Sequence, residues 1–92
     1  MNPRTAAWLC FANAAIAGYA LHRLGGWVAG EPDPRMVGPS VHTPYFWRMS
    51  TALWWGVLAA LAGWRFPGIG RVAEKALPWV VGAATIQAFL VP

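Results

Sequence analysis

Two histidines, His22 and His42, are the residues of this 92-residue sequence whose type best suits cofactor chemistry. Imidazole nitrogen is a common axial ligand of haem iron, so two histidines turned inward would predict a haem-, pigment- or quinone-binding membrane anchor. Gly18 precedes His22 by about one helical turn and would leave room for a flat macrocycle such as haem or a chlorophyll-type pigment. The alternative, which we favour, is that both histidines are polar caps at a water boundary.

Other chemistry finds little support in the residue types. Cys10 is the single cysteine, and with two histidines it cannot complete a four-ligand zinc site unless a loop carboxylate joins them. Ser50 has no evident base nearby, and no glycine-rich phosphate loop follows a strand. We therefore expect neither an enzyme nor a metal site, and Cys10 is expected to be an inert, small apolar residue.

The composition indicates what surrounds these residues. Hydrophobic residues make up 58% of the chain and charged residues only 11%, whereas a soluble domain carries about 25% charged residues. So few charges cannot cover a domain of this size, and much of the apolar surface must face something other than water. The sequence therefore predicts an all-α integral membrane protein and argues against disorder or a disulfide scaffold.

Charged residues divide the chain into three apolar segments, predicted as transmembrane helices at about 5–23, 45–64 and 72–91 of a single membrane domain. At 1.5 Å per residue, each segment is barely long enough for a hydrocarbon core of about 30 Å. A cleaved signal peptide is the alternative for the first segment, which we expect to be retained. Pro78 lies inside the third segment and is expected to kink it.

A loop at about 25–44 is predicted to join the first two helices outside the membrane. It holds four prolines and four glycines, so we expect irregular structure that faces solvent or lies against a partner. Basic residues favour an inner N-terminus by four to three, which puts the C-terminus outside. The single lysine and the abundance of Ala, Gly, Pro and Arg suggest a bacterial inner membrane.

Small residues spaced four apart predict close packing of helices, because they let backbones approach. The alternative is that the same faces pack against another protein. These positions are Ala14, Gly18, Ala52, Gly56 and Ala60, and Gly63 lies on the same helix face as the last three. Asn13 and Gln87 lie inside the predicted spans and are expected to form interhelical hydrogen bonds of about 0.6–2 kcal/mol rather than to line a pore.

Seven tryptophans are an unusually large number for a chain of 92 residues. Five lie near predicted span ends, where indole is commonly anchored at the lipid headgroups. These anchors are Trp8, Trp27, Trp47, Trp64 and Trp79. The adjacent pair Trp54 and Trp55 lies deeper, beside Leu53, Leu58 and Leu61, on a bulky helix side suited to lipid or to another subunit.

Three functions remain open. The favoured one is an accessory, structural subunit of a larger membrane complex (respiratory, photosynthetic or transport) whose partners are larger membrane subunits and lipids. A holin-like self-assembling pore is second, although such proteins generally end in a basic tail and 88–91 here is apolar. The cofactor-binding anchor is third. Nucleic acid is not an expected partner, because the net charge of +4 lies in short segments flanking the spans.

Overall fold

The computed structural model describes residues 1–28 and 44–90, and the side chains of residues 1–28 and 49–90. Three helices account for almost all of this part of the chain. They are α1 (Pro3–Val28), α3 (Pro44–Arg65) and α4 (Ile69–Leu90). Each of the three predicted segments is helical in this part of the chain, but α1 and α4 extend past the charged residues that were taken as their ends. The loop predicted at 25–44 lies largely outside the described residues, and its first residues belong to α1.

The helix ends follow from local chemistry. At the start of α1, the Asn2 side-chain oxygen accepts a hydrogen bond from the Arg4 backbone N–H at 2.8 Å, and Pro3 takes the first helical position, where no N–H is needed. Between α3 and α4, Pro67 disfavours helix at Phe66 and forces a turn of three residues. Sequence chemistry is thus sufficient to place these boundaries.

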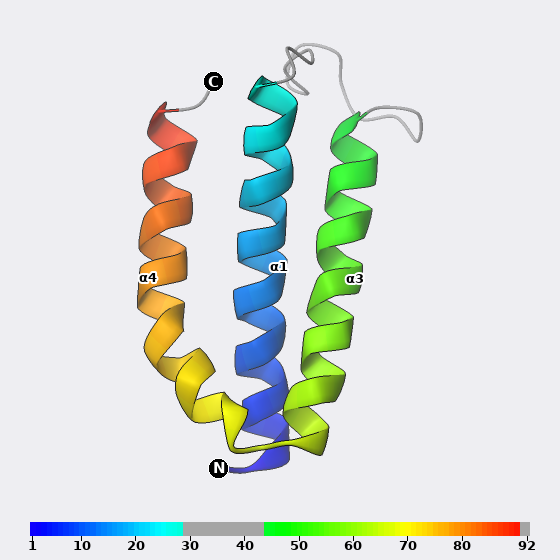
Figure 1. Cartoon of the computed structure of the whole chain (residues 1–92), viewed down its shortest axis with the longest axis vertical. Coiled ribbons are helices and arrows are strands. Elements are labelled where there is room, and N and C mark those ends of the chain that lie inside the picture. The colour runs from blue at the N-terminus through cyan, green and yellow to red at the C-terminus, as the bar shows by residue number, and fades with distance from the viewer. Residues whose placement is uncertain (29–43, 91–92) are drawn as a thin grey trace.

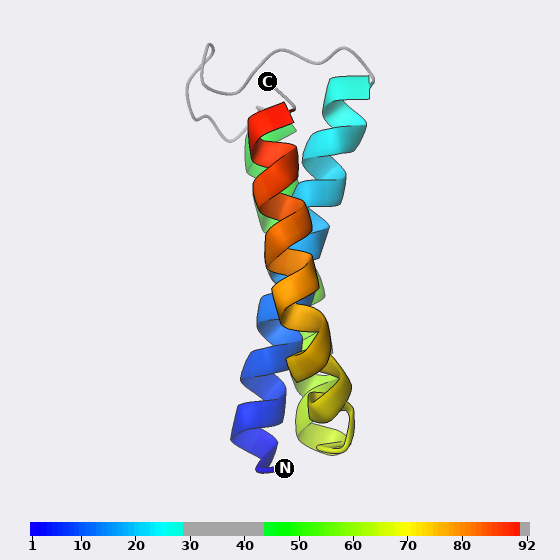
Figure 2. The ribbon, with the colours of Figure 1, turned by 90° about the vertical axis from the view of Figure 1, so that its left-hand side faces the viewer.

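The three helices lie side by side in one layer, with α1 between α3 and α4 (Figure 1). Viewed along the layer, α4 lies in front and the other two helices behind it (Figure 2). The molecule measures 42 × 26 × 17 Å, and its shortest dimension exceeds one helix diameter of about 10–12 Å only modestly. The helices therefore do not close around a central core.

The prediction of membrane-spanning helices has to be corrected. Among the described residues, no helix is both long enough and apolar enough to cross a membrane. Length is adequate at 22 to 26 residues, so apolarity is what the helices lack. The integral-membrane fold class, the inner-membrane location and the N-inside orientation are therefore wrong.

The physical reason lies in which residues form the helices. α1 continues through Arg23, and α4 begins before Arg71 and includes Glu74 and Lys75, so charges fall inside helices. Glycine, tyrosine and tryptophan occupy many of the remaining positions, and indole and phenol carry polar groups. The mean hydropathy of the whole chain is accordingly only +0.42.

The seam between α1 and α3 is built on close backbone approach. A Cβ on Gly63 would lie 2.8 Å from the Ala6 carbonyl oxygen and 2.9 Å from Cys10 Sγ. A Cβ on Gly56 would lie 2.8 Å from the Phe11 ring. Glycine is therefore required at these two positions for α3 to lie where it does.

Interior packing is provided by small residues. Within the described residues, the buried apolar side chains are Ala6, Cys10, Ala52 and Ala73, and no large side chain is fully buried. The helices are thus held together by narrow seams while the large apolar residues face outward.

Substitution at Gly63 tests the seam. Gly63→Ala is expected to lower the free energy of unfolding by about 1–3 kcal/mol, because the new methyl group meets the Ala6 backbone, which cannot move aside. Gly25→Ala is the matched control, since nothing lies within 4 Å of a Cβ there. This control is expected to gain roughly 0.5–1 kcal/mol. Equal effects in chemical denaturation would contradict the close approach of α1 and α3.

Candidate functional site

Two side-chain amides connect α1 to α4. Asn13 Nδ2 donates to the Leu9 carbonyl at 2.8 Å and, across the seam, to the Ala73 carbonyl at 2.9 Å. Near the other end of the seam, Gln87 Nε2 donates to the Ala20 carbonyl at 2.6 Å. Both amides therefore act as interhelical donors to backbone oxygen.

Asn13 sits beside the distortion made by Pro78. Proline inside α4 has no N–H, so the Glu74 carbonyl one turn earlier loses its helical partner. Asn13 donates to the carbonyl immediately before it, that of Ala73. The Asn13 Oδ1 atom is buried and accepts no hydrogen bond, so the side chain acts purely as a donor.

Replacing the amide by a carboxylate at two asparagines separates donor from acceptor roles. Asn13→Asp loses both donated bonds and places negative charge against the Ala73 carbonyl, so we expect unfolding to become easier by about 2–4 kcal/mol. Asn2→Asp keeps the acceptor that caps α1 and should be neutral or slightly stabilising. Thermal melts of both variants at neutral pH measure the difference, and an unaffected Asn13→Asp would contradict the donor role.

His22, one of the two candidate cofactor ligands, packs against tryptophan. Its ring lies 4.8 Å from the Trp55 ring between centroids, at 49°, and its Nε2 atom is buried without a hydrogen-bond partner. The space beside Gly18 that could have received a macrocycle is taken by the same indole, whose Cε3 atom is 2.7 Å from where a Cβ would lie. The second candidate ligand, His42, lies outside the described residues. On the side of His22, therefore, Trp55 leaves no open space at Gly18 for a macrocycle.

Cys10 is buried in the seam against Gly63. Burial raises the pKa of the Cys10 thiol, because the thiolate loses hydration there. A protonated, covered thiol is a poor nucleophile and a poor metal ligand. No group of three His, Cys, Asp or Glu side chains within the described ranges could hold a metal ion.

The thiol offers a direct readout of seam opening. Alkylation of Cys10 by a maleimide at neutral pH is expected to be at least about tenfold slower in the native chain than in denaturant. The raised pKa favours the folded state below the ordinary thiol pKa, and this contribution declines as the pH rises through the raised value. Cys10→Ala, which keeps the Cβ, should lack that alkaline decline. Equal alkylation rates would contradict a closed seam.

The remaining positions expected to pack, and the tryptophans, have these places. Gly18, Ala52, Gly56 and Gly63 are buried, whereas Ala14 and Ala60 are half-buried. Four expected anchors are exposed, namely Trp8, Trp27, Trp64 and Trp79, and Trp8 also packs edge-on against Phe11. Trp47 lies in α3 with its side chain outside the described set. The headgroup-anchor interpretation depended on the membrane spans and falls with them; Trp79 lies near the middle of α4 rather than at an end.

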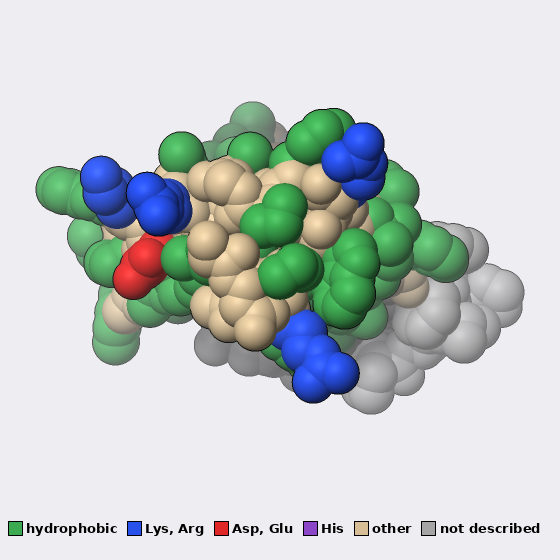
Figure 3. Space-filling view, turned by 90° about the horizontal axis from the view of Figure 1, so that it is seen from below, with side chains coloured by type: hydrophobic (Ala, Val, Ile, Leu, Met, Phe, Trp, Pro, Cys, Tyr) green, Lys and Arg blue, Asp and Glu red, His purple; other side chains and the backbone are tan. Residues whose placement is uncertain are grey.

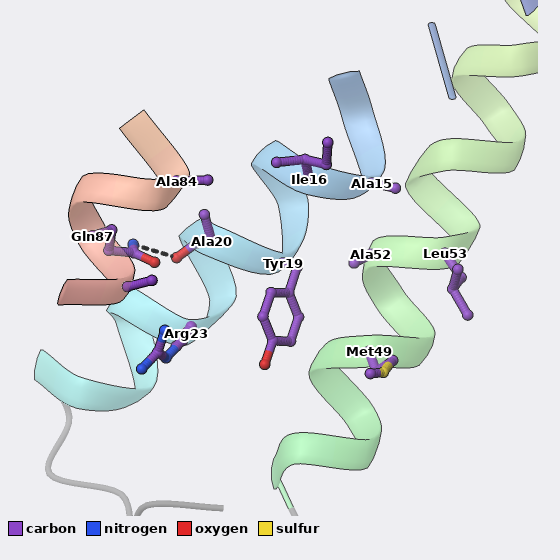
Figure 4. A pocket seen from close by; sticks show the side chains of 11 residues that line it. Ala15, Ile16, Tyr19, Ala20, Arg23, Met49, Ala52, Leu53, Ala84 and Gln87 are labelled. Atoms are coloured by element: carbon purple, nitrogen blue, oxygen red, sulfur yellow. Dashed lines mark hydrogen bonds between the residues drawn. The ribbon is translucent and has the colours of Figure 1, made fainter. Parts of the chain in front are cut away.

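A shallow groove crosses one broad face of the layer. Its volume is about 320 Å³, and side chains of all three helices line it. Figure 4 shows Gln87 with its bond to Ala20 on one side, and Met49 and Leu53 on the other. Alanines on three neighbouring helices leave this hollow, and Arg23 is the one charged residue among its described lining residues.

The outward side of α3 continues from this groove. It presents large apolar side chains to solvent over about three helical turns, and we call it the α3 face. Its members are Leu53, Trp54, Val57, Leu58, Leu61 and Trp64, all exposed. Leu53 belongs to both the groove and the α3 face. No described residue between Ser50 and Trp64 is charged, so the face is uniformly apolar.

Charge is gathered at the end of the layer where the chain begins. Arg4, Arg65, Arg71 and Lys75 are exposed there, with Glu74 among them. Seen from that end, Lys and Arg side chains lie around the rim of an otherwise apolar and backbone surface (Figure 3). Arg65 also stacks on the Phe66 ring at 4.9 Å. This end is suited to water, in contrast to the α3 face.

No protein-family model, curated protein or solved structure matches the chain. Function must therefore be argued from the geometry. The described residues bring together narrow seams, an apolar groove and exposed apolar sides of α3 and α4, and they assemble no set of nucleophile, base and acid. Sequence reasoning did not foresee the groove, because its alanines come from three separate segments.

Proposed function

We propose that the protein is an accessory, structural subunit that docks on a larger protein through the α3 face and the adjoining groove. The observation that carries the proposal is the inverted distribution of side-chain size. Within the described residues the buried apolar side chains are small, whereas Trp54, Leu58 and Leu61 are each more than 60% exposed. An apolar surface of this extent on a free chain would remain in unfavourable contact with water.

The geometry suits docking of a protein partner. Trp54, Leu58 and Leu61 are spaced four and three residues apart, so they form one stripe along the helix. Aromatic and aliphatic side chains at this spacing are typical anchors of helix-mediated interfaces, where large exposed tryptophans contribute most binding energy. The groove beside Leu53 has a volume of about 320 Å³, which is room for a side chain of the partner.

A structural role also agrees with the chemistry of the described residues. Asn13 and Gln87 donate to backbone carbonyls, and Cys10 is covered in a seam. Each of these polar or reactive groups serves the packing of the chain itself. The surface left for interaction is apolar, which favours stable association over reaction with a small substrate.

Purification of a tagged chain at its native expression level tests the proposal. The native mass should reveal a discrete assembly that contains one larger polypeptide in a fixed ratio to this chain. Leu58→Glu should lower recovery of that polypeptide at least about tenfold, because it places a charge at the centre of the α3 face.

Leu21→Glu on α1 is the matched control, since Leu21 and Leu58 are 60% and 61% exposed. This control should retain the larger polypeptide. Circular dichroism of both variants checks that the helices persist. Recovery of the chain without any larger polypeptide, or equal retention by both variants, would overturn the proposal.

A further inference from the structure

Helix α4 carries two apolar stripes on opposite sides. The inner stripe contacts α1 and consists of residues that alternate three and four positions apart. Its members are Gly70, Ala73, Leu77, Val80, Ala84 and Gln87, all buried or half-buried. This alternation is the heptad spacing of packed helices.

The outer stripe repeats the same spacing two residues further along the chain. Its members are Val72, Lys75, Trp79, Gly82, Ile86 and Phe89, all exposed. Two residues correspond to about 200° around a helix, so this stripe points directly away from α1. It lies on the free edge of the layer, where α4 has no neighbouring helix (Figure 1). Trp79 and Phe89 are 81% and 86% exposed.

We propose that the outer stripe pairs α4 with α4 of a second copy of this chain, in antiparallel orientation about a twofold axis between Trp79 and Gly82. In this orientation, the large residue Trp79 of each copy faces the open position Gly82 of the other, so the stripe is complementary to itself. Nothing lies within 4 Å of a Cβ at Gly82, so each Trp79 indole enters the space above Gly82 of the other copy as a knob enters a hole. The same register sets Val72 against Phe89 of the second copy.

Charge selects the antiparallel orientation. Arg71 and Lys75 lie in the first two turns of α4, and no residue from Ala76 to Leu90 is charged. A parallel pair would set Lys75, a member of the outer stripe, directly against Lys75 of the second copy, which is repulsive. An antiparallel pair brings these cations beside the C-terminal end of the other α4, where the helix dipole carries partial negative charge.

A second copy explains the stripe better than an unrelated protein does. The apolar knobs, the open position and the cations all lie in the one helix, and the antiparallel register satisfies each of them at once. The α3 face lacks charges that would set such a register. Because α3 and α4 occupy opposite edges of the layer, pairing through α4 leaves two α3 faces free, and the dimer becomes a bivalent form of the proposed subunit.

Sedimentation velocity of the full chain across a wide range of concentration tests the pairing. The expected species is a dimer with twice the 10.0 kDa chain mass. Gly82→Leu fills the hole at a position where a Cβ has no neighbour within 4 Å. It should raise the dissociation constant at least about tenfold while leaving helix content unchanged or higher. Trp79→Glu removes the knob and should do the same.

Leu58→Glu on the α3 face is the control and should leave the dimer intact, which separates this inference from the proposed function. A chain that is monomeric at every concentration would overturn the inference. So would a dimer that persists in Gly82→Leu and Trp79→Glu but is lost in Leu58→Glu.

Disulfide trapping in a Cys10→Ala background tests the orientation. Chains with Val72→Cys mixed with chains with Phe89→Cys should form the mixed disulfide, and chains with Val72→Cys alone should not cross-link. Cross-linking of Val72→Cys with itself in preference to the mixed pair would show a parallel arrangement and overturn the register.

Discussion

The close approach of α1 to its two neighbours is the interaction on which the rest of this structure depends. α1 is the central helix of the layer, and its partners reach it only where side chains are absent or minimal. At Gly63 the α3 backbone lies almost against the α1 carbonyl of Ala6, and at Gly70 the α4 backbone meets the Ala6 side chain as well. One alanine on α1 is therefore common to both seams. Asn13 and Gln87 add directional hydrogen bonds between α1 and α4, which is the less extensive of the two seams.

This construction determines what the surface must be. Narrow seams of small residues bury little apolar area, and burial of large side chains usually provides most of the stability of a domain. Here the large side chains extend from the outer sides of α3 and α4. In the single chain Trp54, Leu58 and Trp79 remain exposed, so the free energy of removing them from water is not yet gained. Association with another protein would cover these side chains and gain it. The proposed docking through α3 and pairing through α4 both follow from this single feature.

Much of the secondary structure was predictable, because proline chemistry is local. Pro3 and Pro67 mark a helix start and a turn, and Pro78 was correctly expected inside the third helix. The error arose from treating Arg23 and Arg71 as helix ends, whereas an arginine side chain within a helix can extend its guanidinium into water while its stem covers apolar surface. Composition added to the error, since it scores tryptophan and alanine together with leucine.

The arrangement of the helices could not be obtained from the sequence. α3 and α4 are joined by a short turn, yet both pack on α1, because α1 carries small or polar residues on two sides. The contact of His22 with Trp55 joins residues 33 positions apart and follows only from the register of the α1–α3 seam. Local pattern therefore predicted the elements, and long-range packing decided which residues meet.

Oxidative footprinting of the native assembly, read against the isolated chain, tests most directly the claim that the outward apolar residues are covered by protein. The expected result is that Trp54 and Leu58 react readily in the isolated chain and are protected in the assembly, while the exposed residue Leu21 reacts equally in both. Equal reactivity of Trp54 and of Leu58 in the two samples would contradict the claim, because the large apolar side chains of the α3 face would then face water in the working state.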